Sequence, residues 1–163
     1  MVWGKRNQPI EVELTNERQR QTYYGAVNFQ THRFHLKAFR AGNGRHTVEY
    51  VEWLRTLYPT AKLLLLWDGA SYHRYAEMQA YLTTLNPSLE PHEWLVTCLL
   101  FAPNAPDQNP VEDIWLQGKN FLPKHFSLHK TFAQVKHSFF DCLNDLKFES
   151  TKFSSYSHNP QLI

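Results

Sequence analysis

Apolar and polar residues alternate along the first part of the chain. Residues 10–14 alternate Ile, Glu, Val, Glu and Leu, a pattern that predicts a half-exposed strand. Two β-rich runs follow, residues 23–29 and 34–39, and only the short polar stretch 30–33 separates them. This spacing predicts an antiparallel hairpin.

Unbroken apolar runs then replace the alternation. Residues 63–67 are four leucines and a tryptophan, set between Lys62 and Asp68. Such a run predicts a strand buried on both faces, in the middle of a mixed or parallel sheet. Residues 94–101 form a second continuous apolar strand. Asp68 therefore ends a buried strand, where open α/β sheets usually bind ligands, although a helix cap would explain a single acid there equally well.

Helical spacing accounts for much of the remaining chain. The expected helices span residues 47–58, 73–85, 110–122 and 131–146. Thr47 is expected to cap the first helix, and Thr131 with Gln134 makes a capping box for the last. The order of strands and helices predicts one α/β domain with a mixed sheet, antiparallel first and parallel later. Residues 149–163 show no period, and we expect a loose tail there.

Composition narrows the class of protein. The 163 residues are 42% hydrophobic and 15% aromatic, as in a packed globular domain. No stretch approaches the roughly 20 apolar residues of a membrane span, and the polar start lacks a signal-peptide core, so we expect no membrane association. Cys98 and Cys142 fall in apolar and helical runs. They are typical of reduced core residues, and we expect a cytoplasmic protein.

Charge is unevenly distributed along the chain. Residues 1–62 hold ten Lys and Arg against five Asp and Glu, whereas residues 63–163 hold seven against ten. A basic part beside an acidic part suits a protein that holds a polyanion near a cation-binding carboxylate cluster. An ordinary solvated surface would give the same split.

A second candidate acid follows the second apolar strand. Asn109 can cap the expected helix, and Glu112 then occupies the position from which a capping-box Glu contacts Asn109. Two features favour a further role: a long proline-stiffened loop precedes the helix, and its strand is expected to lie parallel to the one ending at Asp68. Two carboxylates at one sheet edge repel unless a cation lies between them, and hard oxygen ligands select Mg²⁺ or Mn²⁺.

Two segments carry a family resemblance. Residues 67–73, WDGASYH, resemble the D-[NG]-A-S-x-H segment of the mariner-like bacterial insertion-sequence transposases. Residues 103–115, PNAPDQNPVEDIW, resemble their P-x-x-P-[DE]-x-N-P-[IV]-E-x-x-W segment. Residues 3–4 and 24–26 look like earlier signposts of the same family, so the resemblance spans about residues 2–125. It implies a ribonuclease H-like DDE/D nuclease and strand-transferase core.

The resemblance also implies roles for particular residues. Asp68 matches the second catalytic acid and Glu112 the third, so both would ligate Mg²⁺ or Mn²⁺. His73 and Asn109 match positions that flank the site. The metals would let water, and then a DNA 3′-hydroxyl, attack a phosphodiester without a covalent enzyme intermediate. The expected partner is DNA, both transposon ends and target, and no small-molecule substrate is expected.

Basic residues near these segments are candidates for DNA contacts. Lys119 and Lys124 lie on and after the helix that carries Glu112, close enough to a nuclease site to meet phosphates. Arg40 and Arg45 flank a Gly-rich stretch that could hold phosphates. Exposed surface lysines and a plain solvated turn are the competing interpretations.

The chain departs from the family on its amino-terminal side. The family's first acid lies upstream of the segment matched by residues 3–4, and no Asp occurs before Asp68. We therefore expect an α/β fold: a ribonuclease H-like mixed sheet with flanking helices that lacks its first, central strand and leaves two apolar edges unpaired. Residues 1–148 would form a partial DDE transposase catalytic domain, without the family's helix-turn-helix module. We expect this polypeptide alone not to transpose DNA, and whether it forms a homodimer stays open.

Two other functions stay open at this point. The chain could be a transposase remnant that binds DNA or a partner protein without catalysis. Alternatively, Asp68 and Glu112 could both be helix caps in an unrelated flavodoxin-like binding domain, which leaves the paired motifs unexplained. Dependence on a divalent metal separates both from a nuclease.

Overall fold

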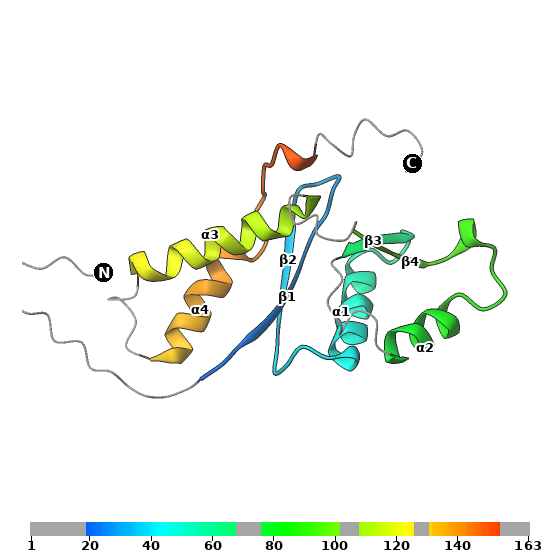
Figure 1. The fold of residues 1–163 in the computed structure, drawn as a ribbon, viewed down its shortest axis with the longest axis horizontal. Helices are drawn as coiled ribbons and strands as arrows, with labels where there is room; N and C mark the ends of the chain where they lie inside the picture. The colour runs from blue at the N-terminus through cyan, green and yellow to red at the C-terminus, as the bar shows by residue number, and fades with distance from the viewer. Residues whose placement is uncertain (1–18, 68–75, 102–107, 126–130, 154–163) are drawn as a thin grey trace, which may run out of the picture.

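The computed structural model describes residues 19–67, 76–101, 108–125 and 131–153 (Figure 1). The expected strand at residues 10–14, Asp68 and His73 lie outside the described residues. The elements, in chain order, are β1 (Thr22–Val27), β2 (Phe34–Phe39), α1 (Gly44–Leu57), β3 (Leu63–Trp67), α2 (Ala76–Leu85), the 3₁₀ helix η2 (Pro91–Glu93), β4 (Val96–Leu100), α3 (Pro110–His125) and α4 (Phe132–Leu143).

Strands β1 and β2 form the predicted antiparallel hairpin. They pair along their whole length, from Thr22 opposite Phe39 to Val27 opposite Phe34. At the tip, the Asn28 side-chain oxygen accepts hydrogen bonds from the two following turn amides, each at 2.9 Å. Asn favours such turns because its short side chain substitutes for a backbone acceptor.

Strands β3 and β4 form a second sheet, and they are parallel as predicted. Leu63 lies opposite Val96 and Trp67 opposite Leu100. The apolar runs in the sequence thus correspond to real strands. Within the described residues the two sheets stay separate, each with two strands.

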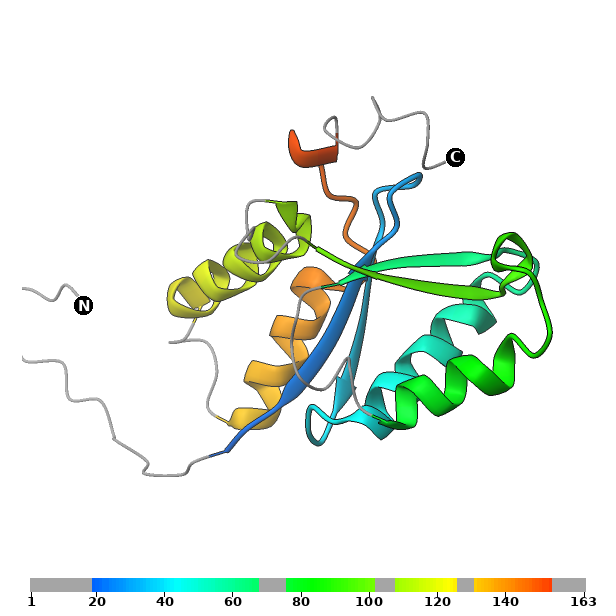
Figure 2. The same ribbon diagram turned by 45° about the vertical axis from the view of Figure 1, so that its right-hand side comes forward.

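Helix α1 joins the two sheets into one layered domain. Tyr24 of β1 and Tyr50 and Leu54 of α1 share a buried cluster, and Leu63 and Leu65 of β3 pack against it. Helices α3 and α4 lie on the other side of the hairpin, while α2 lies beside α1 (Figures 1 and 2). This mixed α/β architecture, antiparallel first and parallel later, agrees with the ribonuclease H-like expectation. No strand in the described ranges pairs with both β1 and β3.

The expectation that residues 63–67 are buried on both faces is wrong within the described part of the chain. Leu63 and Leu65 pack against α1 and α2. Leu64 and Leu66 are 44% and 40% exposed. The reason is the placement of α3 and α4, which cover the β1–β2 hairpin and not the second face of β3–β4. An apolar run shows what a strand contains, but not which helices cover it.

The expected cap of α1 is also wrong. Asn43 caps the helix, because its side-chain oxygen accepts a hydrogen bond from the His46 N–H at 2.9 Å and its backbone is extended. Thr47 lies buried in the first turn, where its hydroxyl donates to the Asn43 carbonyl at 3.0 Å. At α4 the predicted Thr131–Gln134 capping box is confirmed.

The tail expected from residue 149 packs on the domain in its described part. Phe153 is only 5% exposed, and residues 154–163 lie outside the described residues.

Cys98 and Cys142 are free thiols. Burial raises the pKa of Cys98 to about 12 and raises that of Cys142. In the described ranges, no helix has the length and apolarity that a membrane span needs.

Candidate active site

The carboxyl ends of β3 and β4 meet at one edge of their sheet. Trp67 and Leu100 are the last pair, and the Phe101 N–H donates to the Trp67 carbonyl at 2.9 Å. Asp68 follows Trp67 directly in the chain, though it lies outside the described residues. Helix α3 begins at Pro110, ten residues after β4 ends. The two candidate acids thus follow neighbouring parallel strands.

Asn109 organises the first turn of α3. Its side-chain oxygen accepts a hydrogen bond from the Val111 N–H at 3.1 Å, and its carbonyl accepts one from the Glu112 N–H at 3.3 Å. The predicted capping role of Asn109 is therefore confirmed. Because Pro110 has no N–H, this arrangement also removes one donor that the helix start would otherwise leave unsatisfied.

Glu112 is exposed in this first turn. Its side chain has no hydrogen bond or ion pair with any residue that the structure describes, and the capping-box contact back to Asn109 is not made there. The helix-cap explanation of Glu112 thus loses its main support. The carboxylate is open to a ligand, and it lies where the helix dipole favours negative charge.

Asp113 was missed by sequence reasoning. It follows Glu112 in the same turn, and one of its carboxylate oxygens accepts a bond from the Lys152 ammonium at 2.9 Å. The Lys152 ammonium also donates to the Asn109 carbonyl, at 3.4 Å. Two adjacent acids at a helix start were a visible signal, whereas nothing in the sequence pointed to Lys152.

The buried side of α3 fixes the position of its first turn. Ile114 is fully buried against Phe34, Leu36 and Leu143. Trp115 meets the Phe34 ring edge to face, with centroids 5.4 Å apart. Since Glu112 lies only two residues before Ile114, this packing determines where the Glu112 backbone lies.

The four candidate DNA-contact residues lie on α3 and around the start of α1. Lys119 and Lys124 are exposed on α3, and Lys124 lines a groove of about 550 Å³ together with Asp113. Arg40 is exposed after β2, but Arg45 belongs to the first turn of α1, where it pairs with Glu49 at 2.9 Å. The expected Gly-rich loop with two arginines is therefore wrong, because the helix begins at Gly44.

A divalent metal fits part of this arrangement. Exposed carboxylate oxygens such as those of Glu112 are the ligands that Mg²⁺ and Mn²⁺ prefer. The residues that the structure describes contain no group of three or more His, Cys, Asp or Glu able to hold a metal. A complete ligand set would therefore need Asp68 or other residues outside the described ranges.

Comparison with known proteins identifies the family to which the sheet edge and the start of α3 belong. A family model described as DDE superfamily endonuclease matches residues 1–136, which include the sheet edge, Asp68 and the start of α3. None of the curated proteins matches the chain. The family match covers most of the chain and both candidate acids. The chain therefore belongs to the DDE superfamily endonucleases.

Proposed function

We propose that this chain is part of the catalytic domain of an insertion-sequence transposase, and that Asp68 and Glu112 bind the divalent metal used to cut and join DNA. The observation that carries the proposal is the start of α3. Glu112 is exposed there without a partner among the described residues, and α3 follows a strand parallel to β3, which ends one residue before Asp68. Membership of the endonuclease family supports the same reading.

Each residue has a defined task in this proposal. The carboxylates of Asp68 and Glu112 hold Mg²⁺ or Mn²⁺, which when bound would activate the attacking oxygen and stabilise the leaving one. Asn109 fixes the turn that carries Glu112. Lys119 and Lys124 neutralise DNA phosphates along the exposed side of α3, so binding should weaken as salt rises.

We further propose that the chain alone does not complete the reaction. In the described ranges no strand pairs with both β1 and β3, and no group of three ligands is present. Two carboxylates give weaker metal affinity than a full ligand set and position the metal less rigidly.

Metal titration tests the site itself. We expect Mn²⁺ to bind the purified chain weakly by calorimetry, and Asp68→Asn or Glu112→Gln to weaken this binding further. Glu52→Gln is the matched control, because Glu52 is an exposed acid on α1. Equal binding by all four proteins would contradict a metal site at Asp68 and Glu112 and would favour a non-catalytic remnant.

Plasmid nicking tests the competence of the chain. With Mg²⁺ and supercoiled DNA, the purified chain is expected to produce no nicks above those made by Asp68→Ala. Nicking that is lost in Asp68→Ala would show that the chain is competent alone, contradicting the proposed incompetence while supporting the nuclease assignment.

A further inference from the structure

The described end of the chain forms a strap across the domain. Residues 144–153, here called the C-terminal strap, run beside β2 and then toward the start of α3 (Figures 1 and 2). The Phe34 N–H donates to the Leu146 carbonyl at 2.8 Å, and the Asp145 N–H donates to the Phe34 carbonyl at 3.1 Å. The strap is thus joined by backbone hydrogen bonds to Phe34, the first residue of β2.

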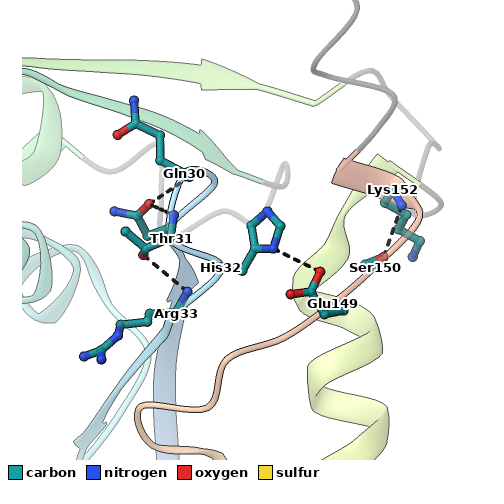
Figure 3. A network of polar contacts seen from close by, with 8 residues as sticks. Gln30, Thr31, His32, Arg33, Glu149, Ser150 and Lys152 are labelled. Carbon is teal, nitrogen blue, oxygen red and sulfur yellow. Dashed lines mark hydrogen bonds and ion pairs between the residues drawn. The ribbon is translucent and has the colours of Figure 1, made fainter.

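The strap is anchored on the tip of the hairpin. The Phe148 N–H donates to the His32 carbonyl at 2.8 Å. The His32 ring stacks on Phe153, with centroids 4.5 Å apart, and its Nδ1 lies 3.2 Å from a Glu149 carboxylate oxygen (Figure 3). Because Phe153 is buried, the residue before it has little freedom to move away.

Lys152 is that residue, and it points to α3. Its backbone N–H donates to the Ser150 hydroxyl at 3.2 Å (Figure 3). Its ammonium binds the Asp113 carboxylate at 2.9 Å and the Asn109 carbonyl at 3.4 Å. Both acceptors belong to the turn that carries Glu112, so the strap connects the hairpin tip to the candidate active site.

The pairing separates two neighbouring carboxylates. Successive residues of an α-helix project about 100° apart around its axis, so Glu112 and Asp113 leave the helix in different directions. Asp113 is committed to Lys152, whereas Glu112 has no partner among the described residues. A cation near a helix start is unfavourable by itself, and the Asp113 carboxylate offsets that cost.

We propose that Lys152 is a positioning residue for the metal site. By binding Asp113 and the Asn109 carbonyl, it fixes the first turn of α3 and keeps Asp113 from competing with Glu112 for the metal. This inference rests on the proposed function, since it assigns Lys152 to the same site.

The contact of Lys152 with Asp113 and the Asn109 carbonyl is here called the clamp. A double-mutant cycle without metal tests it. Lys152→Met and Asp113→Asn are each expected to speed amide hydrogen exchange in the first turns of α3 by about threefold, the effect of a partly exposed ion pair. The double variant should exchange no faster than either single variant, because both remove the same contact. Lys152→Arg should restore slow exchange. Lys147→Met is the matched control on the same strap and should change nothing.

Two results would overturn the clamp. One is unchanged exchange in Lys152→Met, and the other is equal acceleration in α3, α4 and β1, which indicates a general loss of stability.

The second measurement adds Mn²⁺ and follows the broadening of side-chain NMR signals. In wild type, broadening should be strongest at Asp68 and Glu112, and in Lys152→Met the Asp113 signal should broaden at a lower Mn²⁺ concentration than it does in wild type.

The two measurements keep the two proposals apart. Unaltered broadening in Lys152→Met would overturn the positioning role. No Mn²⁺ effect in wild type would overturn the proposed function, whereas the exchange cycle is measured without metal and decides the clamp by itself.

Discussion

At the residue scale, the site depends on how helix α3 is held. Glu112 is exposed, yet Ile114 two residues later is fully buried in a cluster with β2 and α4. The position of the exposed Glu112 is therefore set by the apolar contact that Ile114 makes on another side of the helix. Ring packing between Trp115 and Phe34 restricts the rotation of the helix.

A pair of substitutions on α3 separates buried from exposed side chains. Ile114→Ala should lower the free energy of unfolding by about 2–5 kcal/mol, because it leaves a cavity in the core. Leu116→Ala, at a position that is 55% exposed, should change it by less than about 0.5 kcal/mol. Urea unfolding followed by tryptophan fluorescence measures both. Similar losses in the two variants would contradict the described orientation of α3.

His35 should make stability depend on pH. Burial lowers its pKa, and its Nε2 lies 2.7 Å from the Tyr58 hydroxyl. The folded state therefore favours neutral His35, so its contribution to stability is complete above the unfolded pKa of about 6.5 and is lost as the pH falls from there through the lower folded pKa. Urea midpoints at pH 7.5 and 5.5 should differ less in His35→Gln than in wild type. His92→Gln, at an exposed position, should retain the wild-type difference. An unchanged difference in His35→Gln would contradict this assignment.

At the element scale, local patterns predicted most of the secondary structure. The hairpin, both apolar strands and the Thr131–Gln134 capping box follow from alternation, apolar runs and cap chemistry within a few residues. The predictions were wrong where contacts with a segment distant in the sequence determine the local structure. Thr47 is a residue type that often caps helices, but its hydroxyl lies 3.2 Å from the Tyr24 hydroxyl. The backbone of Asn43 is extended, so the helix begins earlier in the chain than predicted, at Gly44.

The corrected helix start gives a direct test. Asn43→Ala removes the side-chain acceptor for the His46 N–H and should cost about 1 kcal/mol of stability. Asn120→Ala, an exposed position within α3, should be neutral or slightly stabilising, because Ala has the higher helix propensity. Thermal unfolding by circular dichroism measures both variants. A neutral Asn43→Ala would restore Thr47 as the better candidate for the cap.

The candidate site was only partly predictable for the same physical reason. Motif spacing pointed to Asp68, Asn109 and Glu112, because a strand end and a helix start are local features. Lys152 contacts the site only because the chain returns over β2, and no local pattern records that contact. Its partner Asp113 could have been suspected from its place beside Glu112.

At the scale of the whole molecule, the two sheets share α1 but do not pair within the described residues. The outer face of the second sheet exposes apolar side chains from both of its strands, namely Leu64, Leu66 and Leu99. Unpaired edges and exposed apolar faces are where chains associate. Among the described residues, this outer face is therefore the apolar surface most suited to contact with another chain.

This surface predicts self-association. Leu64→Lys with Leu66→Lys should raise the concentration at which light scattering appears, while the circular dichroism spectrum is retained. Leu65→Lys places a charge against α1 on the other face of the same strand. It should destabilise the fold, because a charge at this partly buried position has no described partner. If the variant with Leu64→Lys and Leu66→Lys still self-associates, the outer face of the β3–β4 sheet is not the surface through which the chains associate.

The central claim is that Asp68 and Glu112 share one divalent metal at the carboxyl edge of the β3–β4 sheet. The most direct measurement is a Mn²⁺ titration of the labelled chain by NMR, following signals next to both residues. The account predicts that both sets of signals broaden at the same Mn²⁺ concentration, and that Asp68→Asn or Glu112→Gln relieves the broadening at both positions. Broadening at one residue only, or broadening that survives either substitution, would contradict a shared site.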